Sequence, residues 1–238
     1  MRTTKVLDQR VDSFTLEEVF KLTKISIKKK QKNLFFAVNI NILVQLHKDK
    51  FFKKIHSKFA RIIFADGVLI IFLSYFSKNK IKNRVSGTDL TQKLINDENL
   101  KIFLLGSTES VLKKIKNKYS SIYGFYSPPF NNKWLKEEKG KIIKMINKSE
   151  ANILLVATGP LKQERWLLDN FSQVNCNVGI GIGSALDIIA GEKMRAPRLL
   201  RDFGFEWLWR VLLEPKRLMG RYIKDFFYLL KMFIIMKK

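Results

Sequence analysis

Short apolar runs alternate with amphipathic stretches along the first two hundred residues of this chain, and this alternation restricts its fold more than any other feature. The apolar runs are typical of buried β-strands, and strands are predicted at residues 35–38, 60–65, 101–106, 151–157 and 177–182. Helices are predicted between them, including residues 40–52 and 109–119. Strands that are apolar throughout and separated by helices form a mostly parallel sheet covered on both faces. The sequence therefore predicts an α/β fold with a Rossmann-like core.

Each predicted strand ends next to a polar residue or a glycine. Parallel strands bring these ends to one edge of the sheet, where ligands of open α/β folds bind. The candidate site residues of this kind are Asn39, Asp66, Gly106, Gly159, Gly181 and Gly183. Any one of them alone is also an ordinary turn residue. Their joint placement favours a single cleft.

Three side chains near this edge suit a reaction on a phosphorylated substrate. Asp66 directly follows a strand and is a candidate general base for an attacking hydroxyl group. Gln163 lies in a segment that is predicted to open a helix with Pro160 in its first turn, which would offer free N–H groups to a phosphate. Arg84 is a candidate bidentate donor to the same anion, although a surface ion pair would also explain it.

Metal and cofactor sites are not expected from the sequence. It contains no Asp-x-Asp pair, and His47 and His56 lie on a Lys-rich stretch that reads as a helix. Cys176 is the one cysteine, which excludes an internal disulfide and is typical of a core residue in a reducing compartment. If a nucleoside diphosphate is the leaving group, Arg and Lys side chains and helix N-termini have to stabilise its charge.

The chain is strongly basic, with 45 Lys and Arg against 21 Asp and Glu and a formal net charge of +24. Because 46% of the residues are hydrophobic, this charge does not indicate disorder. It favours an anionic partner, which is either nucleic acid or an acidic membrane surface.

The pattern changes at residue 195, and two domains are predicted: an α/β catalytic domain at residues 1–194 and a helical, basic and aromatic appendage at residues 195–238. Pro215 is expected to divide the appendage into two helices. Arg217, Arg221 and Lys224 share a face of the second helix, which suits a lipid headgroup interface; a helix packed on the core with a solvated basic edge fits the periodicity equally well. Apolar runs shorter than the ~20 residues of a membrane span, and the absence of a secretory signal, predict a cytoplasmic protein that is peripheral on the inner face of the membrane.

From residue 7 to about residue 222 the chain resembles the WecG/TagA/CpsF glycosyltransferases of bacterial surface-polysaccharide synthesis. The resemblance is most specific at residues 65–67, at residues 159–164 and in the series from Gly181 to Arg217. The resemblance implies an inverting, metal-independent transferase without a cofactor. Its UDP-sugar donor would carry an N-acetylmannosamine-type sugar, and its acceptor would be the 4-hydroxyl group of a GlcNAc on undecaprenyl diphosphate. Teichoic acid, capsule, exopolysaccharide and enterobacterial-antigen pathways all stay open.

The resemblance also implies roles for individual residues. Asp66 matches the proposed base of the family, next to Asn39, and Arg84 and Gln163 match positions near the donor diphosphate. Asp187 matches an aspartate that lines the nucleotide pocket, and Arg210 and Arg217 match arginines that close over the site at the membrane. Gly106, Gly159, Gly181 and Gly183 at the strand ends are assigned to the same donor site, and Arg221 is added to the closing arginines because it stands next to Gly220. Two positions depart from the family pattern: Ala37 stands where a threonine is usual, and Gly220 where an arginine is frequent.

Two other hypotheses fit parts of the sequence. A basic nucleic-acid-binding protein would explain the charge but not the motifs, and the transferase hypothesis needs no nucleic-acid partner. A nicotinamide-dependent oxidoreductase would explain Gly181 and Gly183 after a strand, but Leu186 stands in place of the third glycine of that fingerprint. Self-association as a homo-oligomer stays open.

Overall fold

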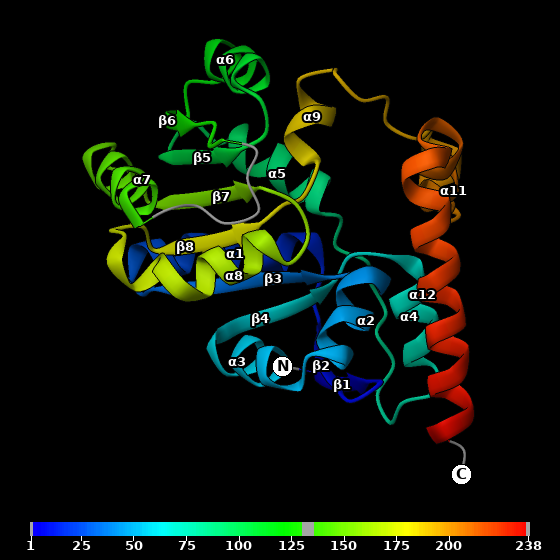
Figure 1. The fold of residues 1–238 in the computed structure, drawn as a ribbon. Coiled ribbons are helices and arrows are strands. Elements are labelled where there is room, and N and C mark those ends of the chain that lie inside the picture. Colours follow the sequence, from blue (N-terminus) through cyan, green and yellow to red (C-terminus); the bar gives the residue numbers. More distant parts are fainter. Residues whose placement is uncertain (1, 130–135, 237–238) are drawn as a thin grey trace.

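A computed structural model describes residues 2–129 and 136–236 of the chain. Its centre is an eight-stranded sheet with the strand order β1-β2-β4-β3-β8-β7-β5-β6 (Figure 1). The strands are β1 (Arg2–Val6), β2 (Gln9–Ser13), β3 (Asn33–Val38), β4 (Ala60–Ala65), β5 (Ile102–Gly106), β6 (Ile122–Tyr126), β7 (Ile153–Ala157) and β8 (Val178–Gly181). The pairing of β1 with β2 is antiparallel and the other pairings are parallel. The predicted mostly parallel sheet is confirmed.

Helices cover both faces of the sheet, as the apolar strands predicted. One face carries α1 (Leu16–Lys28), α5 (Gly87–Ile95), α6 (Glu109–Lys118) and α9 (Ala185–Ile189). The other carries α2 (Ile40–Lys48), α3 (Lys50–Phe59), α4 (Val68–Ser74), α7 (Lys136–Lys148) and α8 (Lys162–Asn170), which a 3-10 turn at Phe171–Gln173 follows. Two hydrophobic clusters therefore form, one on each face.

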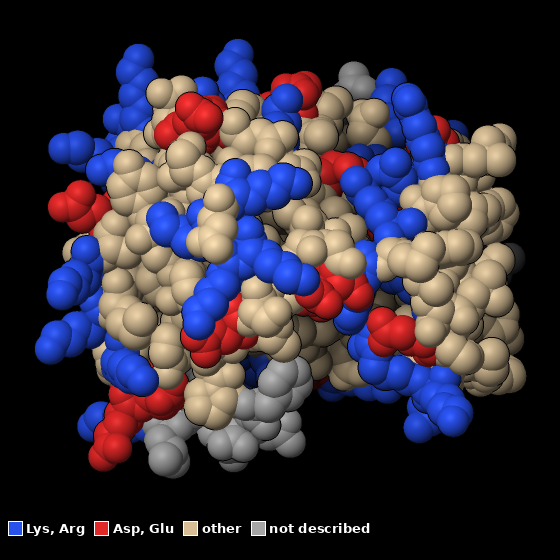
Figure 2. Space-filling view, turned by 90° about the horizontal axis from the view of Figure 1, so that it is seen from above, with Lys and Arg blue, Asp and Glu red and all other residues tan. Residues whose placement is uncertain are grey.

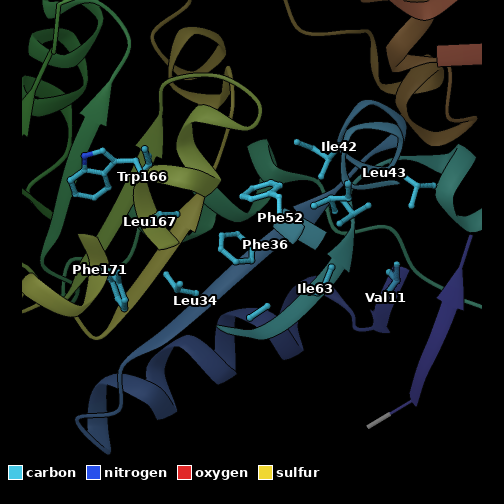
Figure 3. Close-up of a cluster of buried hydrophobic side chains, with 14 of the residues drawn as sticks. Val11, Leu34, Phe36, Ile42, Leu43, Phe52, Ile63, Trp166, Leu167 and Phe171 are labelled. Atoms are coloured by element: carbon cyan, nitrogen blue, oxygen red, sulfur yellow. The ribbon is translucent and has the colours of Figure 1, made fainter. Parts of the chain in front are cut away.

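Figure 3 shows how side chains from distant segments fill the second of these clusters. Phe36 of β3 is fully buried and stacks on the ring of His56 at a centroid distance of 4.3 Å. Trp166 and Leu167 of α8 and Phe52 of α3 pack against the same face. Cys176 is also buried in this cluster, and burial raises the pKa of its thiol to about 12. Its expected role as a core residue is confirmed.

The helix that was predicted over residues 40–52 is wrong as a single element. The chain breaks at Asp49, whose side chain accepts the N–H of Phe52 at 2.8 Å and caps α3. A second correction concerns Pro160, which precedes α8 instead of lying in its first turn; the residue before the helix is Leu161, with a φ of 65°. Thr108 caps α6 by accepting the N–H of Val111.

The C-terminal stretch forms three helices, where two were predicted. They are α10 (Arg198–Asp202), α11 (Glu206–Leu213) and α12 (Pro215–Met236), and Pro215 begins α12 as its first residue. Figure 1 shows α12 running along the side of the core beside α2. Asn41 donates to Asp225 at 3.0 Å, and the hydroxyl of Tyr228 lies 2.8 Å from Nδ1 of His47, so polar contacts join the two helices. Among the described residues, no helix has the length and apolar character needed to cross a bilayer.

Candidate active site

A cleft of about 490 Å³ lies at the carboxyl edge of the parallel strands and extends under the C-terminal helices. Strand ends on one side and α11 and α12 on the other enclose it. All of the site residues expected from the sequence line it: Asn39, Asp66, Arg84, Gly106, Gly159, Gln163, Gly181, Gly183, Asp187, Arg210, Arg217 and Arg221. The sheet thus brings together residues that are spread over most of the chain.

The strand order fixes how these residues follow one another along the edge. Asp66 follows β4, Asn39 follows β3, and Gly181 ends β8, so these three lie on adjacent strands. Gly106 ends β5, four strand positions from β4. At the usual spacing of neighbouring strands, the two ends of the row are ~19 Å apart. The cleft is therefore long, with Asp66 toward one end.

Asp66 occupies an environment that disfavours its charged form. Burial raises the pKa of its carboxyl above the ordinary value and is the largest influence on it. The nearby carboxylate of Glu206 raises this pKa further, whereas Arg210, Arg84 and the backbone N–H of Gly87 lower it. A carboxylate with a raised pKa and flanking cations is suited to accept a proton from a hydroxyl group.

Asn39 stands beside this carboxylate on the neighbouring strand. Its side-chain oxygen accepts the N–H of Ile42 at 3.1 Å and caps α2. The amide NH₂ of Asn39 is thereby oriented by the helix that it caps, at a fixed place in the cleft wall.

Arg84 and Arg210 reach the cleft from different parts of the chain and meet at one carboxylate. Nη1 of Arg84 lies 3.1 Å from Oε2 of Glu206, and Nη2 of Arg210 lies 3.2 Å from Oε1 of the same residue. Arg84 precedes α5 in the core, whereas Glu206 and Arg210 are both on α11. Arg84 does form an ion pair, as the alternative hypothesis held, but the pair is not on the surface. Its side chain is only 19% exposed, and both partners line the cleft.

Further ion pairs join the C-terminal helices to the end of the cleft near Asp187. Lys193 lies 3.3 Å from Asp187 and 3.5 Å from Glu214, and Glu214 also pairs with Arg217. Asp187 in turn accepts the hydroxyl of Ser107 at 2.6 Å. One chain of polar contacts therefore connects β5, α9 and the start of α12.

Gln163 is buried at the centre of the cleft wall, and both ends of its amide are bonded. Its oxygen accepts the N–H of Gly183 at 3.0 Å, and its nitrogen donates to Glu164 at 2.7 Å. A Cβ atom at Gly181 would lie 2.8 Å from that nitrogen, so only glycine leaves room for this arrangement. Burial raises the pKa of Glu164 to about 7. The Gln163 amide thus shapes the loop after β8 and keeps one N–H for a ligand.

Gly106 is also fixed by its surroundings. Its φ of 108° is a conformation that other residues rarely adopt, and an added Cβ would lie 2.6 Å from the carbonyl of Ala157 on the neighbouring strand. Both features restrict this position to glycine, and Ser107 and Thr158, with its buried unpaired hydroxyl, line the cleft beside it.

A comparison with protein families decides what kind of protein carries this cleft. The family described as "Glycosyl transferase WecG/TagA/CpsF family" matches residues 4–238. The chain belongs to this family. Relatives from Staphylococcus aureus strains COL and MRSA252, both named N-acetylglucosaminyldiphosphoundecaprenol N-acetyl-beta-D-mannosaminyltransferase, are each 29% identical over 162 residues. The aligned part covers 67% of this chain and 64% of each relative, so the chain matches just under two thirds of their length.

Membership of the WecG/TagA/CpsF family confirms the resemblance on which the residue assignments rest, although it does not test the roles themselves. Sequence reasoning assigned no role to five charged residues of the cleft: Lys162, Glu164, Lys193, Glu206 and Glu214. Glu164 and Glu206 lie inside motifs that carried the resemblance. The partner of Glu206 in the core was not evident, because its contact with Arg84 spans 122 residues.

The two histidines have partners outside the cleft. His56 is buried against Phe36, and burial lowers its pKa to about 3. His47 contacts Tyr228 of α12. In the part of the chain that the structure describes, no three His, Cys, Asp or Glu side chains gather as a metal site would require.

Proposed function

We propose that this protein is an inverting glycosyltransferase that acts without a metal ion. Its donor is a UDP-linked N-acetylmannosamine-type sugar, either N-acetylmannosamine or its uronate. Its acceptor is the 4-hydroxyl group of a GlcNAc on a polyprenyl diphosphate, and the product enters a bacterial surface polysaccharide. The family and the printed names of the relatives support this assignment.

The observation that carries the proposal is a buried carboxylate among arginines at the edge of the sheet. Asp66 accepts the proton of the acceptor hydroxyl while that oxygen attacks the anomeric carbon of the donor. The bond from the anomeric carbon to the diphosphate breaks in the same step, and UDP leaves with the electron pair. Attack on the face opposite the leaving group inverts the configuration of the sugar.

Positive side chains offset the charge that develops on the departing diphosphate. Arg84 and Arg210 stand close to Asp66, and Arg217 and Arg221 line the cleft from α12. Guanidinium groups bind phosphate oxygens through two parallel N–H···O hydrogen bonds. These bonds stabilise charge more strongly in a cleft that excludes water than they do in bulk water. This supply of positive charge supports a reaction that needs no divalent cation.

The length of the cleft suggests how the donor lies. Ser107 and Asp187 at the far end of the row offer a hydroxyl and a carboxylate to the uridine. The diphosphate then passes Gly181, Gly183 and Gln163 near the centre of the edge. The sugar reaches the end where Asp66 and Asn39 stand.

The C-terminal helices form a separate appendage in this proposal, and they place the site at the cytoplasmic face of the membrane. Several of their large apolar side chains are exposed: Leu199, Phe203, Leu212, Phe226 and Phe227. Figure 2 shows a largely uncharged area on the right, which is the side on which α11 and α12 lie in Figure 1, with Lys and Arg around it. Apolar side chains bordered by cations suit an anionic lipid surface that carries the acceptor.

The test is UDP release from a panel of UDP-sugars, with and without a lipid-linked diphosphate-GlcNAc, in the presence of EDTA. Acceptor-dependent release from UDP-N-acetylmannosamine or its uronate supports both the reaction and its metal independence. Activity that EDTA abolishes and Mg²⁺ restores would overturn the metal-free mechanism alone. A folded protein that releases UDP from none of the donors would overturn the proposed reaction.

A further inference from the structure

Glu206 is a buried carboxylate that holds two arginines at once. The residue is 9% exposed and lies at the first position of α11. Each of its oxygens contacts a different guanidinium group: Oε2 lies 3.1 Å from Arg84, and Oε1 lies 3.2 Å from Arg210. Arg210 is one turn away on the same helix, but Arg84 belongs to the core. Glu206 is therefore a link between the C-terminal helices and the core inside the cleft.

The link matters because two guanidinium groups carry like charges, which disfavours their approach to each other. Like charges in a partly buried place repel, and a carboxylate between them turns the repulsion into two attractive contacts. Arg84 and Arg210 each contact Glu206 through one terminal nitrogen. A guanidinium has five N–H donors, so each keeps donors for a phosphate. The bridge aligns the pair without exhausting it.

We propose that Glu206 is a positioning residue: by bridging Arg84 of the core and Arg210 of α11, it holds both guanidinium groups as a pair beside Asp66 and keeps α11 closed over the cleft. The inference rests on the proposed function for its kinetic consequences. Its structural consequence, the attachment of α11 to the core, does not depend on any activity.

The bridge also acts on the proposed base. The groups that influence Asp66 are its own burial, Arg210 and Glu206 from α11, Arg84 from the segment before α5, and the N–H of Gly87 from α5. Glu206 is the negative charge among them, so it raises the pKa of Asp66. Replacing Glu206 by neutral glutamine removes that effect and lowers the pKa of Asp66. The acid limb of the pH profile should then move to lower pH, which a merely structural role would not cause.

The kinetic test compares the wild type with Glu206→Gln and with Asp202→Asn over a pH range, using kcat/KM for the UDP-sugar. Asp202 is an exposed carboxylate on α10 that pairs with Arg198, so its variant removes one negative charge from the C-terminal helices outside the cleft. Glu206→Gln should lower the plateau of kcat/KM by about tenfold, as expected for two lost charge-assisted contacts, and shift the acid limb to lower pH. Asp202→Asn should change neither. An unchanged plateau, or a lower plateau with an unmoved acid limb, would overturn the proposal.

Hydrogen exchange supplies a readout that needs no activity. Backbone amides of residues 206–213 should exchange faster in Glu206→Gln than in the wild type or Asp202→Asn. Arg84→Gln removes the core end of the same bridge and should accelerate exchange in the same peptide, which also covers the case in which Glu206→Gln does not fold. Equal exchange in Arg84→Gln and the wild type would overturn the bridge. If the wild type transfers no sugar yet both bridge variants loosen α11, the proposed function fails and the bridge stands.

Discussion

Gly181 should be irreplaceable for a reason that separates activity from stability. A Cβ atom added at this position would lie 2.8 Å from Nε2 of Gln163 and 3.0 Å from both Cδ and Cγ. These distances are too short, so Gly181→Ala must push the Gln163 side chain aside. The displaced amide then loses the N–H of Gly183 at 3.0 Å and the carboxylate of Glu164 at 2.7 Å.

Gly179 is a matched control two residues earlier on the same strand. A Cβ there would lie 2.8 Å from Phe171 and 2.9 Å from both Leu167 and Leu34, which are core side chains away from the cleft. The two alanine variants thus add the same methyl group to the same strand. One is directed at the site residue Gln163 and the other at hydrophobic packing.

The expected magnitudes differ in kind. Overpacking a tight core costs about 1–3 kcal/mol, so Gly179→Ala should lower the free energy of unfolding by that amount. Gly181→Ala moves a hydrogen-bonded side chain and should cost about 1–2 kcal/mol. A loss of about 1 kcal/mol in the free energy of unfolding lowers Tm by roughly 2–4 °C for a chain of this size. Activity should show the reverse order: Gly181→Ala should lose about tenfold or more in kcat/KM for the UDP-sugar, and Gly179→Ala should stay near the wild type.

Thermal unfolding and UDP-release kinetics on the three proteins test this reasoning, at a temperature where all are folded. A Gly181→Ala protein with wild-type kcat/KM would show that the position of Gln163 does not matter for the donor. Equal losses of activity in both variants would show that strand packing, and not the Gln163 amide, controls the site.

The buried Asp66 carboxyl, the exposed phenylalanines of α12 and the buried His56 ring each lead to a further prediction. Asp66→Asn should lower kcat by about a hundredfold or more, while calorimetry still detects donor binding; full turnover by the variant would remove Asp66 as the base. Because burial raises the pKa of Asp66, the wild-type kcat/KM should rise with pH through a value above the ordinary range of an aspartate. A Phe226→Ser/Phe227→Ser protein should sediment less with anionic vesicles, whereas Phe51→Ser, at a more exposed phenylalanine on α3, should bind as the wild type does. Burial lowers the pKa of His56 from 6.5 to about 3, so between these two pH values the unfolded chain binds a proton that the folded chain does not, and Tm should fall as the pH drops through this range. His56→Phe should reduce this fall in Tm, and an equal fall in both proteins would contradict the assignment.

The central strands could be predicted because they are apolar on both faces. β3, β4, β5, β7 and β8 all appear where short apolar runs stand, with shifts of one or two residues at their ends. The strands that were missed are β1, β2 and β6 at the two edges of the sheet. Edge strands keep polar and charged residues, so β1 and β2 give no continuous apolar run. The turn between them places Leu7 and Asp8 at φ values of 46° and 62°, a hairpin without the usual glycine.

The part of the site that lies at the strand ends could be predicted from the sequence, but the contacts of the C-terminal helices could not. Parallel topology alone brings Asn39, Asp66 and Gly181 to one edge, which is why their placement could be expected from the sequence. Contacts between the core and the C-terminal helices could not, since nothing in the local pattern pairs Arg84 with a glutamate 122 residues later. The helix break at Asp49 was not predicted, because the apolar periodicity continues across it. The break depends on the Asp49 side chain, which accepts the N–H of Phe52 and caps the next helix.

The C-terminal helices contribute to the site as much as they would to a membrane surface. They contact the core through Glu206 at Arg84, through Asp225 at Asn41, and through Lys193, which precedes them and joins Asp187 to Glu214. Arg84, Asn41 and Asp187 all line the cleft, so each link ends at the place where substrate would bind. A force that lifts α11 and α12 from the core would therefore separate Arg210 from Arg84 before it disturbed the sheet. If these helices rest on a lipid surface, they do so with the arginine pair already held by Glu206, so the acceptor that the surface presents meets an assembled site.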